Sequence, residues 1–160
     1  MSDLSHLDEN GELSMVDVGD KEVTRREATA EAIVRMSSAT LRAALSGGLP
    51  KGDVFTTAKV AGILAAKRTP ELIPLTHPLP VTHIEIEFES NPDEGIVRIV
   101  STVRCDGKTG VEIEAMTACS VAALTIYDMC KSAEKGIVIE RVSLLRKSGG
   151  RSGFWNAKDE

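Results

Sequence analysis

Four short segments of the sequence carry side chains that could do chemistry, and the first is Lys51-Gly52-Asp53. It follows a Gly-Gly turn, and Asp53 is a favourable N-cap for a helix that begins after it. A helix N-terminus attracts anions, and a lysine just before it adds positive charge at the same end. Lys51 is therefore a candidate for binding an anion, with a solubilising surface lysine as the alternative.

The second segment is Leu75-Thr76-His77-Pro78, in which proline-rich backbone fixes the position of the histidine. An imidazole titrates in the range that suits proton transfer, and it could also hydrogen-bond a base or a phosphate. A buried histidine satisfied by backbone carbonyls is the alternative. The three histidines lack the spacing of metal ligands, and no cysteine lies beside them. We therefore expect no metal site and no cofactor, although a divalent cation could accompany a phosphorylated ligand.

The third segment is a long apolar helical pattern with charged residues near its end. Successive steps of four, three, four and three residues place Glu114, Ala118, Val121, Thr125 and Asp128 on one face. Lys131 follows Asp128 by one turn on much the same side. Charged groups in an apolar stretch need a reason, and the alternative to a catalytic pair is a simple ion pair at the helix end.

The fourth segment is the run Lys-Ser-Gly-Gly-Arg-Ser-Gly over residues 147–153. Flexible glycines expose backbone N–H groups, and Lys147 and Arg151 add positive charge, so this loop could surround a phosphate. It lacks the residue order of a Walker A loop. A frayed basic tail is the alternative.

Composition limits which class of protein these segments can serve. With 160 residues, of which 42% are hydrophobic, the chain can form one domain with a sizeable core. Its net charge of −5 argues against a nucleic-acid-binding protein. The three cysteines form no CxxC pair, which is typical of a reducing compartment. The polar start of the chain resembles no targeting peptide, and no apolar run approaches the length of a membrane span. We therefore expect a cytoplasmic protein with no nucleic-acid or membrane partner.

The expected architecture is an α+β fold, with an antiparallel sheet and helices packed on one face. Alternation predicts a strand over 28–36, and a hairpin with a solvated acidic face at Glu85, Glu87 and Glu89. The remaining predicted elements are helices over 38–47, 54–68 and 111–134, a turn starting at Thr69-Pro70, a rigid loop over 74–80 and a strand over 137–146. We expect a polar arm over 1–14, a single catalytic domain over 15–153 and a tail over 154–160.

Six blocks of sequence resemble the molybdenum cofactor biosynthesis protein C family, in the same order and over nearly the whole chain. They are MVDV (15–18), KGDV (51–54), AGILAAKRTPELIPLTHPLP (61–80), TGVEIEAMTA (109–118), ALTIYDMCK (123–131) and KSGGRSG (147–153). The resemblance implies a ferredoxin-like fold and a homohexamer built as a trimer of dimers, with active sites between subunits. It also implies a lyase that converts 3′,8-cyclo-7,8-dihydroguanosine 5′-triphosphate to cyclic pyranopterin monophosphate and releases pyrophosphate.

The resemblance also implies roles for individual residues. Asp128 corresponds to the active-site acid or base, and Lys51 and Lys131 correspond to lysines that turnover requires. The substrate-contacting positions correspond to Leu75, Thr76, His77, Ile113 and Glu114, and the basic residues of the pocket correspond to Arg26, Lys67 and Lys147. Thr76 stands where the family usually has cysteine, so thiol chemistry is not expected there.

A mechanism follows as a hypothesis. Lys51 and Lys131 would act as acid and base, because two ammonium groups in one pocket lower each other's pKa. Lys67, Lys147 and Arg151 would bind the triphosphate, while His77 and Glu114 would orient the purine-derived ring. The competing hypotheses are a nucleotide-binding ferredoxin-like regulatory module without catalysis, and a scaffold protein with an exposed apolar patch.

Overall fold

The computed structural model describes residues 10–157, so residues 1–9 of the predicted arm and 158–160 of the predicted tail lie outside it. The helices and strands occur in the following order along the sequence. They are β1 (Thr24–Arg35), α1 (Ser38–Leu45), α2 (Val54–Lys67), α3 (Thr69–Leu72), β2 (Val81–Asn91), β3 (Ile96–Gly107), α4 (Glu112–Cys130), β4 (Val138–Ser148) and β5 (Trp155–Asn156).

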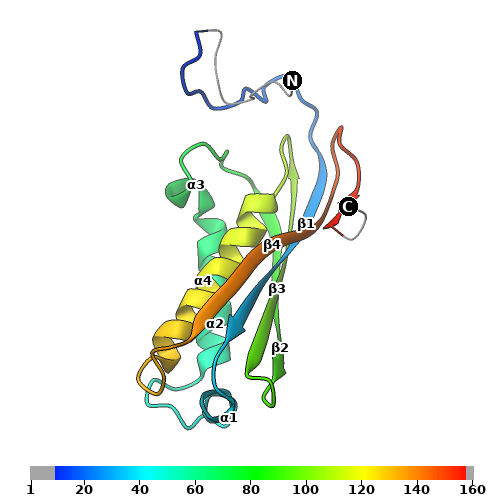
Figure 1. Ribbon diagram of the computed structural model, residues 1–160. Coiled ribbons are helices and arrows are strands. Elements are labelled where there is room, and N and C mark those ends of the chain that lie inside the picture. Colours follow the sequence, from blue (N-terminus) through cyan, green and yellow to red (C-terminus); the bar gives the residue numbers. More distant parts are fainter. Residues whose placement is uncertain (1–9, 158–160) are drawn as a thin grey trace.

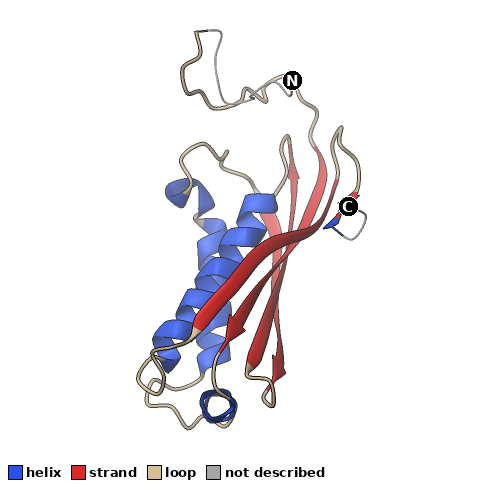
Figure 2. Cartoon of the chain, in the orientation of Figure 1, coloured by secondary structure: helices blue, strands red, loops and turns tan. Residues whose placement is uncertain are grey.

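The strands form one antiparallel sheet in the order β2-β3-β1-β4-β5 (Figure 1). β1 lies in the middle and pairs with β3 along its whole length, from Thr24 opposite Gly107 to Arg35 opposite Ile96. The four long strands and the helices between them follow the β-α-β-β-α-β order of ferredoxin-like folds. The long helices α2 and α4 pack on one face of the sheet (Figure 2). The predicted fold class is confirmed.

The small residues of β1 explain how the helices approach the sheet so closely. Ala28, Ala30 and Ala32 are fully buried on the helix side, where α4 packs against β1. The other face of the same strand is polar. There Glu31 is only 3% exposed, and its carboxylate accepts hydrogen bonds from Arg98 and Arg141, both at 2.6 Å. A buried charge is tolerated when it is paired in this way.

The helix ends follow the capping residues that the sequence supplies. Asp53 caps α2 by accepting a hydrogen bond from the Thr56 N–H at 2.9 Å, and Pro70 lies in the first turn of α3. α2 and α4 meet at Gly62, where an added Cβ would lie 2.8 Å from the carbonyl oxygen of Ala118. The missing side chain therefore lets the two helices touch.

Among the described helices, α4 is the one long and apolar enough to cross a membrane by length and composition. Half of its most apolar window is buried inside the protein, where it packs against α2 and three strands of the sheet. This is how the core helix of a folded domain behaves.

Two predicted boundaries near the C-terminal end are wrong. α4 ends at Cys130 instead of continuing to residue 134, because the Lys131 N–H closes the last turn onto Tyr127 O at 2.8 Å and a turn follows. β4 runs past residue 146 to Ser148, so Lys147 lies in a strand. β1 pairs with this extension on one side and β5 pairs with it on the other, which satisfies its backbone groups.

Candidate functional site

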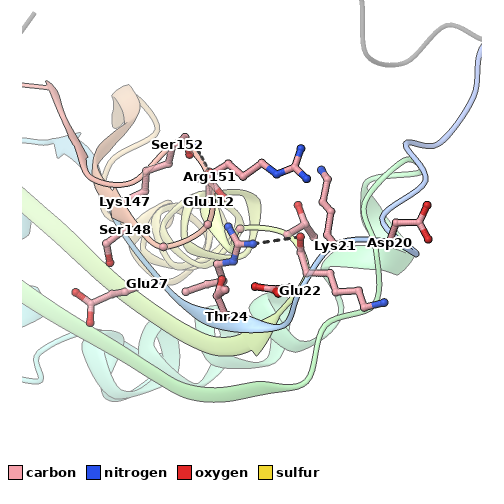
Figure 3. Close-up of a pocket in the computed structure, with 16 residues that line it drawn as sticks. Asp20, Lys21, Glu22, Thr24, Glu27, Glu112, Lys147, Ser148, Arg151 and Ser152 are labelled. Carbon is pink, nitrogen blue, oxygen red and sulfur yellow. Dashed lines mark hydrogen bonds and ion pairs between the residues drawn. The ribbon is translucent and has the colours of Figure 1, made fainter.

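The larger of two adjoining cavities has a volume of about 690 Å³ and lies where the N-terminal segment, the loop before α4 and the glycine-rich loop after β4 meet. Figure 3 shows Arg151 and Lys21 reaching into this region from opposite sides. Its charged lining residues are the basic Lys21, Arg26, Lys108, Lys147 and Arg151 and the acidic Asp20, Glu22, Glu27 and Glu112. The basic side chains can donate charge-assisted hydrogen bonds to an anionic ligand, and the acidic ones offset part of their charge.

The smaller cavity, of about 450 Å³, lies beside the rigid loop that precedes β2. It is lined by the five positions that the resemblance predicted to contact the substrate, which are Leu75, Thr76, His77, Ile113 and Glu114. Four residues line both cavities, namely Lys21, Thr109, Gly110 and Glu112. The two cavities therefore share a wall and form one two-part site.

Arg26 fastens the loop that separates β3 from α4. Its guanidinium donates hydrogen bonds to the carbonyl oxygens of Gly107 and Lys108, both at 3.2 Å. On its other side lies Gly150, with a φ of 72°, where an added Cβ would be 1.7 Å from Nη1 of Arg26. The left-handed backbone favours glycine at this position, and its missing side chain leaves room for the guanidinium, which explains part of the glycine-rich run.

His77 connects the smaller cavity to the N-terminal segment. Its Nε2 lies 2.8 Å from the carbonyl oxygen of Val16. A carbonyl only accepts hydrogen bonds, so Nε2 carries the proton, and the neutral ring then has its acceptor at Nδ1. Thr76 donates its hydroxyl to Ile73 O at 2.8 Å, so this hydroxyl holds the loop rather than supplying a nucleophile.

Glu114 lies at the smaller cavity and is only 3% exposed. Burial is the main cause that raises the pKa of its carboxyl group to about 7, and the nearby charge of Glu112 contributes in the same direction. Glu114 can therefore change its charge near neutral pH, which suits a group that exchanges protons or hydrogen bonds with a ring.

Asp128, Lys51 and Lys131 form a separate cluster at the far end of α4. The two carboxylate oxygens of Asp128 accept from Lys51 Nζ at 2.6 Å and from Lys131 Nζ at 2.7 Å. The hydrogen bonds from Lys131 and then Lys51 lower the pKa of Asp128 to about 2. In return, the hydrogen bond to Asp128 raises the pKa of Lys131. The hypothesis that the paired lysines lower each other's pKa is therefore wrong for Lys131, because a carboxylate lies between the two ammonium groups.

One chain does not bring this cluster and the cavities together. Glu114 and Asp128 lie near opposite ends of α4 (Figure 1), and at a rise of about 1.5 Å per residue their backbones are roughly 21 Å apart. Within the described residues, the linings of both cavities include none of Lys51, Asp128 and Lys131. Lys67 is also absent from these linings, and it is exposed at the end of α2.

Six charged residues that line the larger cavity were not predicted from the sequence, namely Asp20, Lys21, Glu22, Glu27, Lys108 and Glu112. Lys108 and Glu112 flank the start of α4, and a lysine before a helix start is the same signal that drew attention to Lys51. Lys21 gave no such signal, because it is a single lysine in a polar segment and only the fold places it beside the cavity.

In the part of the chain that the structure describes, no group of three or more His, Cys, Asp or Glu side chains is arranged to hold a metal ion. The fold and the site together define a ferredoxin-like α+β protein with a two-part cavity whose larger part is lined by charged side chains.

The sequence profile of the MoaC family matches residues 15–150, and the chain belongs to this family. It is 58% identical over 150 residues to a protein of Herpetosiphon aurantiacus named cyclic pyranopterin monophosphate synthase, covering 94% of this chain and 92% of the relative. A protein of the same name from Pelotomaculum thermopropionicum is 55% identical over 160 residues, covering 100% of this chain and 94% of the relative.

Proposed function

We propose that this chain is a lyase of molybdenum cofactor biosynthesis that makes cyclic pyranopterin monophosphate. Its substrate is 3′,8-cyclo-7,8-dihydroguanosine 5′-triphosphate, and pyrophosphate leaves in the reaction. The proposal is supported by two relatives with this name, which are 58% and 55% identical along nearly their whole length.

The observation that carries the proposal is the shared wall between a cavity with five basic side chains and a cavity that holds His77 and Glu114. The substrate has the matching two parts. Its triphosphate fits the larger cavity with Arg26, Lys147 and Arg151, and its purine-derived ring fits the smaller one. There the imidazole and the carboxyl group of Glu114 can hydrogen-bond the edges of the ring.

The proton transfers are assigned to Lys51, Asp128 and Lys131. Opening the five-membered ring, building the pyrazine ring and closing the cyclic phosphate all move protons. Asp128 keeps Lys131 in its charged form by raising its pKa, which supports Lys131 as a proton donor, and Lys51 is the second lysine on the same carboxylate. Loss of one such group typically lowers the rate by about 10²–10⁴-fold.

These groups reach the substrate if two copies of the chain assemble with the lysine cluster of one against the cavities of the other. A homohexamer, arranged as a trimer of dimers, supplies such contacts, and we place the enzyme in the cytoplasm. Apolar side chains exposed on the helix layer support an assembled state, since Val60, Leu64 and Leu124 are 52%, 47% and 58% exposed in the single chain.

The test is to incubate the purified protein with the cyclic dihydro-GTP substrate and to follow pyrophosphate release and pyranopterin formation together. We expect both products from the unaltered protein and from Lys135→Ala, an exposed lysine outside the cluster, and we expect Lys131→Ala to lose both. Binding of the substrate without either product would overturn the proposal in favour of a non-catalytic nucleotide-binding module.

A further inference from the structure

The ion pair between Lys147 and Glu112 lies inside the larger cavity. Lys147 Nζ is 2.8 Å from Glu112 Oε1, and the two side chains are 31% and 24% exposed. Both residues line the cavity that the proposed function assigns to the triphosphate (Figure 3). The Glu112 carboxylate is therefore already paired with one of the cations that a bound phosphate would need.

The backbone around Glu112 makes room for this carboxylate. A Cβ added at Gly110 would lie only 1.9 Å from Oε2 and 2.8 Å from Oε1 of Glu112. The side chain thus folds back over the α-carbon of Gly110, and any larger residue there would push it away. The absence of a side chain at Gly110 therefore leaves room for the contact with Lys147.

Glu112 also stands where an anion is favoured in any case. It is in the first turn of α4, and the positive end of a helix dipole stabilises negative charge at this position. With a lysine on its other side, the carboxylate has the surroundings of a bound phosphate group. Glu112 lines both cavities, so its side chain remains at their shared wall when its ion pair with Lys147 breaks.

We propose that Glu112 is an internal competitor for Lys147. When no polyphosphate is bound, the Glu112 carboxylate forms the ion pair with Lys147. The triphosphate of the ligand displaces this carboxylate from the lysine, and the ion pair forms again as pyrophosphate leaves. A polyphosphate wins this exchange because it carries more charge and more acceptor oxygens than one carboxylate. The identity of the ligand rests on the proposed function, whereas the exchange itself needs only a polyphosphate.

The test is a double-mutant cycle read by calorimetric binding of inorganic triphosphate at low salt without magnesium. Glu112→Gln keeps the size of the side chain and removes the competing charge, so we expect binding to tighten by about three- to tenfold. In a Lys147→Ala background, Glu112→Gln frees no lysine, so the tighter binding of triphosphate should disappear. Glu22→Gln removes a negative charge from the same cavity. It therefore measures how much triphosphate binding tightens when any carboxylate of the cavity is neutralised.

Three outcomes would overturn the inference. They are unchanged or weaker binding by Glu112→Gln, an equal gain in the Lys147→Ala background, and a gain from Glu22→Gln of the same size. If Glu112→Gln does not fold, Glu112→Asp replaces it, because its shorter side chain keeps the charge but withdraws it from Lys147, and it should also tighten binding. Inorganic triphosphate is not turned over, so a failed synthase assay leaves this measurement valid, and a failed cycle leaves the synthase proposal untouched.

Discussion

Asp128 accepts a hydrogen bond from each of two lysines, and this position determines how the cluster titrates. Replacing it by asparagine removes the charge that raises the pKa of Lys131. We therefore expect Asp128→Asn to lower the pKa of Lys131, to shift the alkaline limb of the pH–rate profile to lower pH and to reduce turnover by about 10²–10⁴-fold. Isotope-labelled lysine followed by NMR gives the pKa directly, and an unchanged value for Lys131 would contradict the assignment.

Glu114 makes stability depend on pH in the opposite direction from a paired carboxylate. Its pKa is about 7 in the folded protein and 4.5 in the reference state, so the folded state binds the proton more tightly. Stability from this group is present below pH 4.5 and is lost as the pH rises through about 7. The loss amounts to roughly 3 kcal/mol at alkaline pH.

Glu114→Gln should remove this pH dependence. Relative to the unaltered protein, the variant should gain free energy of unfolding between pH 5 and pH 8, by up to about 3 kcal/mol. Urea unfolding of both proteins at the two pH values measures the difference, in which the other titrating groups cancel. Parallel pH profiles for the two proteins would show that Glu114 titrates normally.

The sequence predicted the members of the lysine cluster but not their joint geometry. The spacing of Asp128 and Lys131 predicts that they share a helix face, and the structure brings their charged atoms to 2.7 Å. Lys51 comes from a distant segment, so its contact with Asp128 depends on how α2 packs against α4. The hydrogen bond to Asp128 that raises the pKa of Lys131 is local to the end of α4, whereas the second lysine on this carboxylate is supplied by packing that residue types and spacing do not reveal.

At the scale of elements, Gly62 sets how closely α2 approaches α4, and through it the position of Lys51. A Cβ added there would lie 2.5 Å from Ile86 Cδ1 and 2.8 Å from the Ala118 carbonyl oxygen. Overpacking of this kind costs about 1–3 kcal/mol, whereas alanine gains only about 1 kcal/mol over glycine in a helix. We therefore expect Gly62→Ala to lower the free energy of unfolding and to reduce turnover.

Gly136→Ala is the matched control, because an added Cβ there meets no atom within 4 Å. Replacing a glycine in a compatible backbone reduces the freedom of the unfolded chain, so this variant should be neutral or more stable by up to about 1 kcal/mol. Chemical denaturation of both variants checks the pair. A Gly62→Ala protein as stable as the unaltered one would mean that the helices can move apart at little cost.

Local signals account for the elements that the sequence predicted correctly. The alternation in β1 and the hairpin of β2 and β3, the Asp53 cap and Pro70 each act within a few residues. The missed features depend on neighbours that are distant in sequence. β4 continues through Lys147 because β1 and β5 pair with its end, and the cavity includes Lys21 because His77 and Lys108 hold the N-terminal segment at Val16 and Gly19.

At the scale of the whole molecule, the central feature is the distance between the two halves of the site. The cavities with His77 and Glu114 lie at one end of α4, and the lysine cluster lies at the other. No rotation of side chains closes a gap of roughly 21 Å. Family resemblance predicted sites between subunits, and this stays a prediction; if the cluster and the cavities act on one substrate, they must come from different chains.

Complementation between two inactive variants tests this arrangement most directly. His77→Ala damages one half of the site and Lys131→Ala damages the other, so each protein alone should lose turnover. Chains mixed at random form mixed dimers in about half of cases, each with one intact site of two, so co-expression should restore about a quarter of the unaltered activity. Pyrophosphate release measures it. Activity no greater than the sum of the two variants would contradict a site shared between subunits.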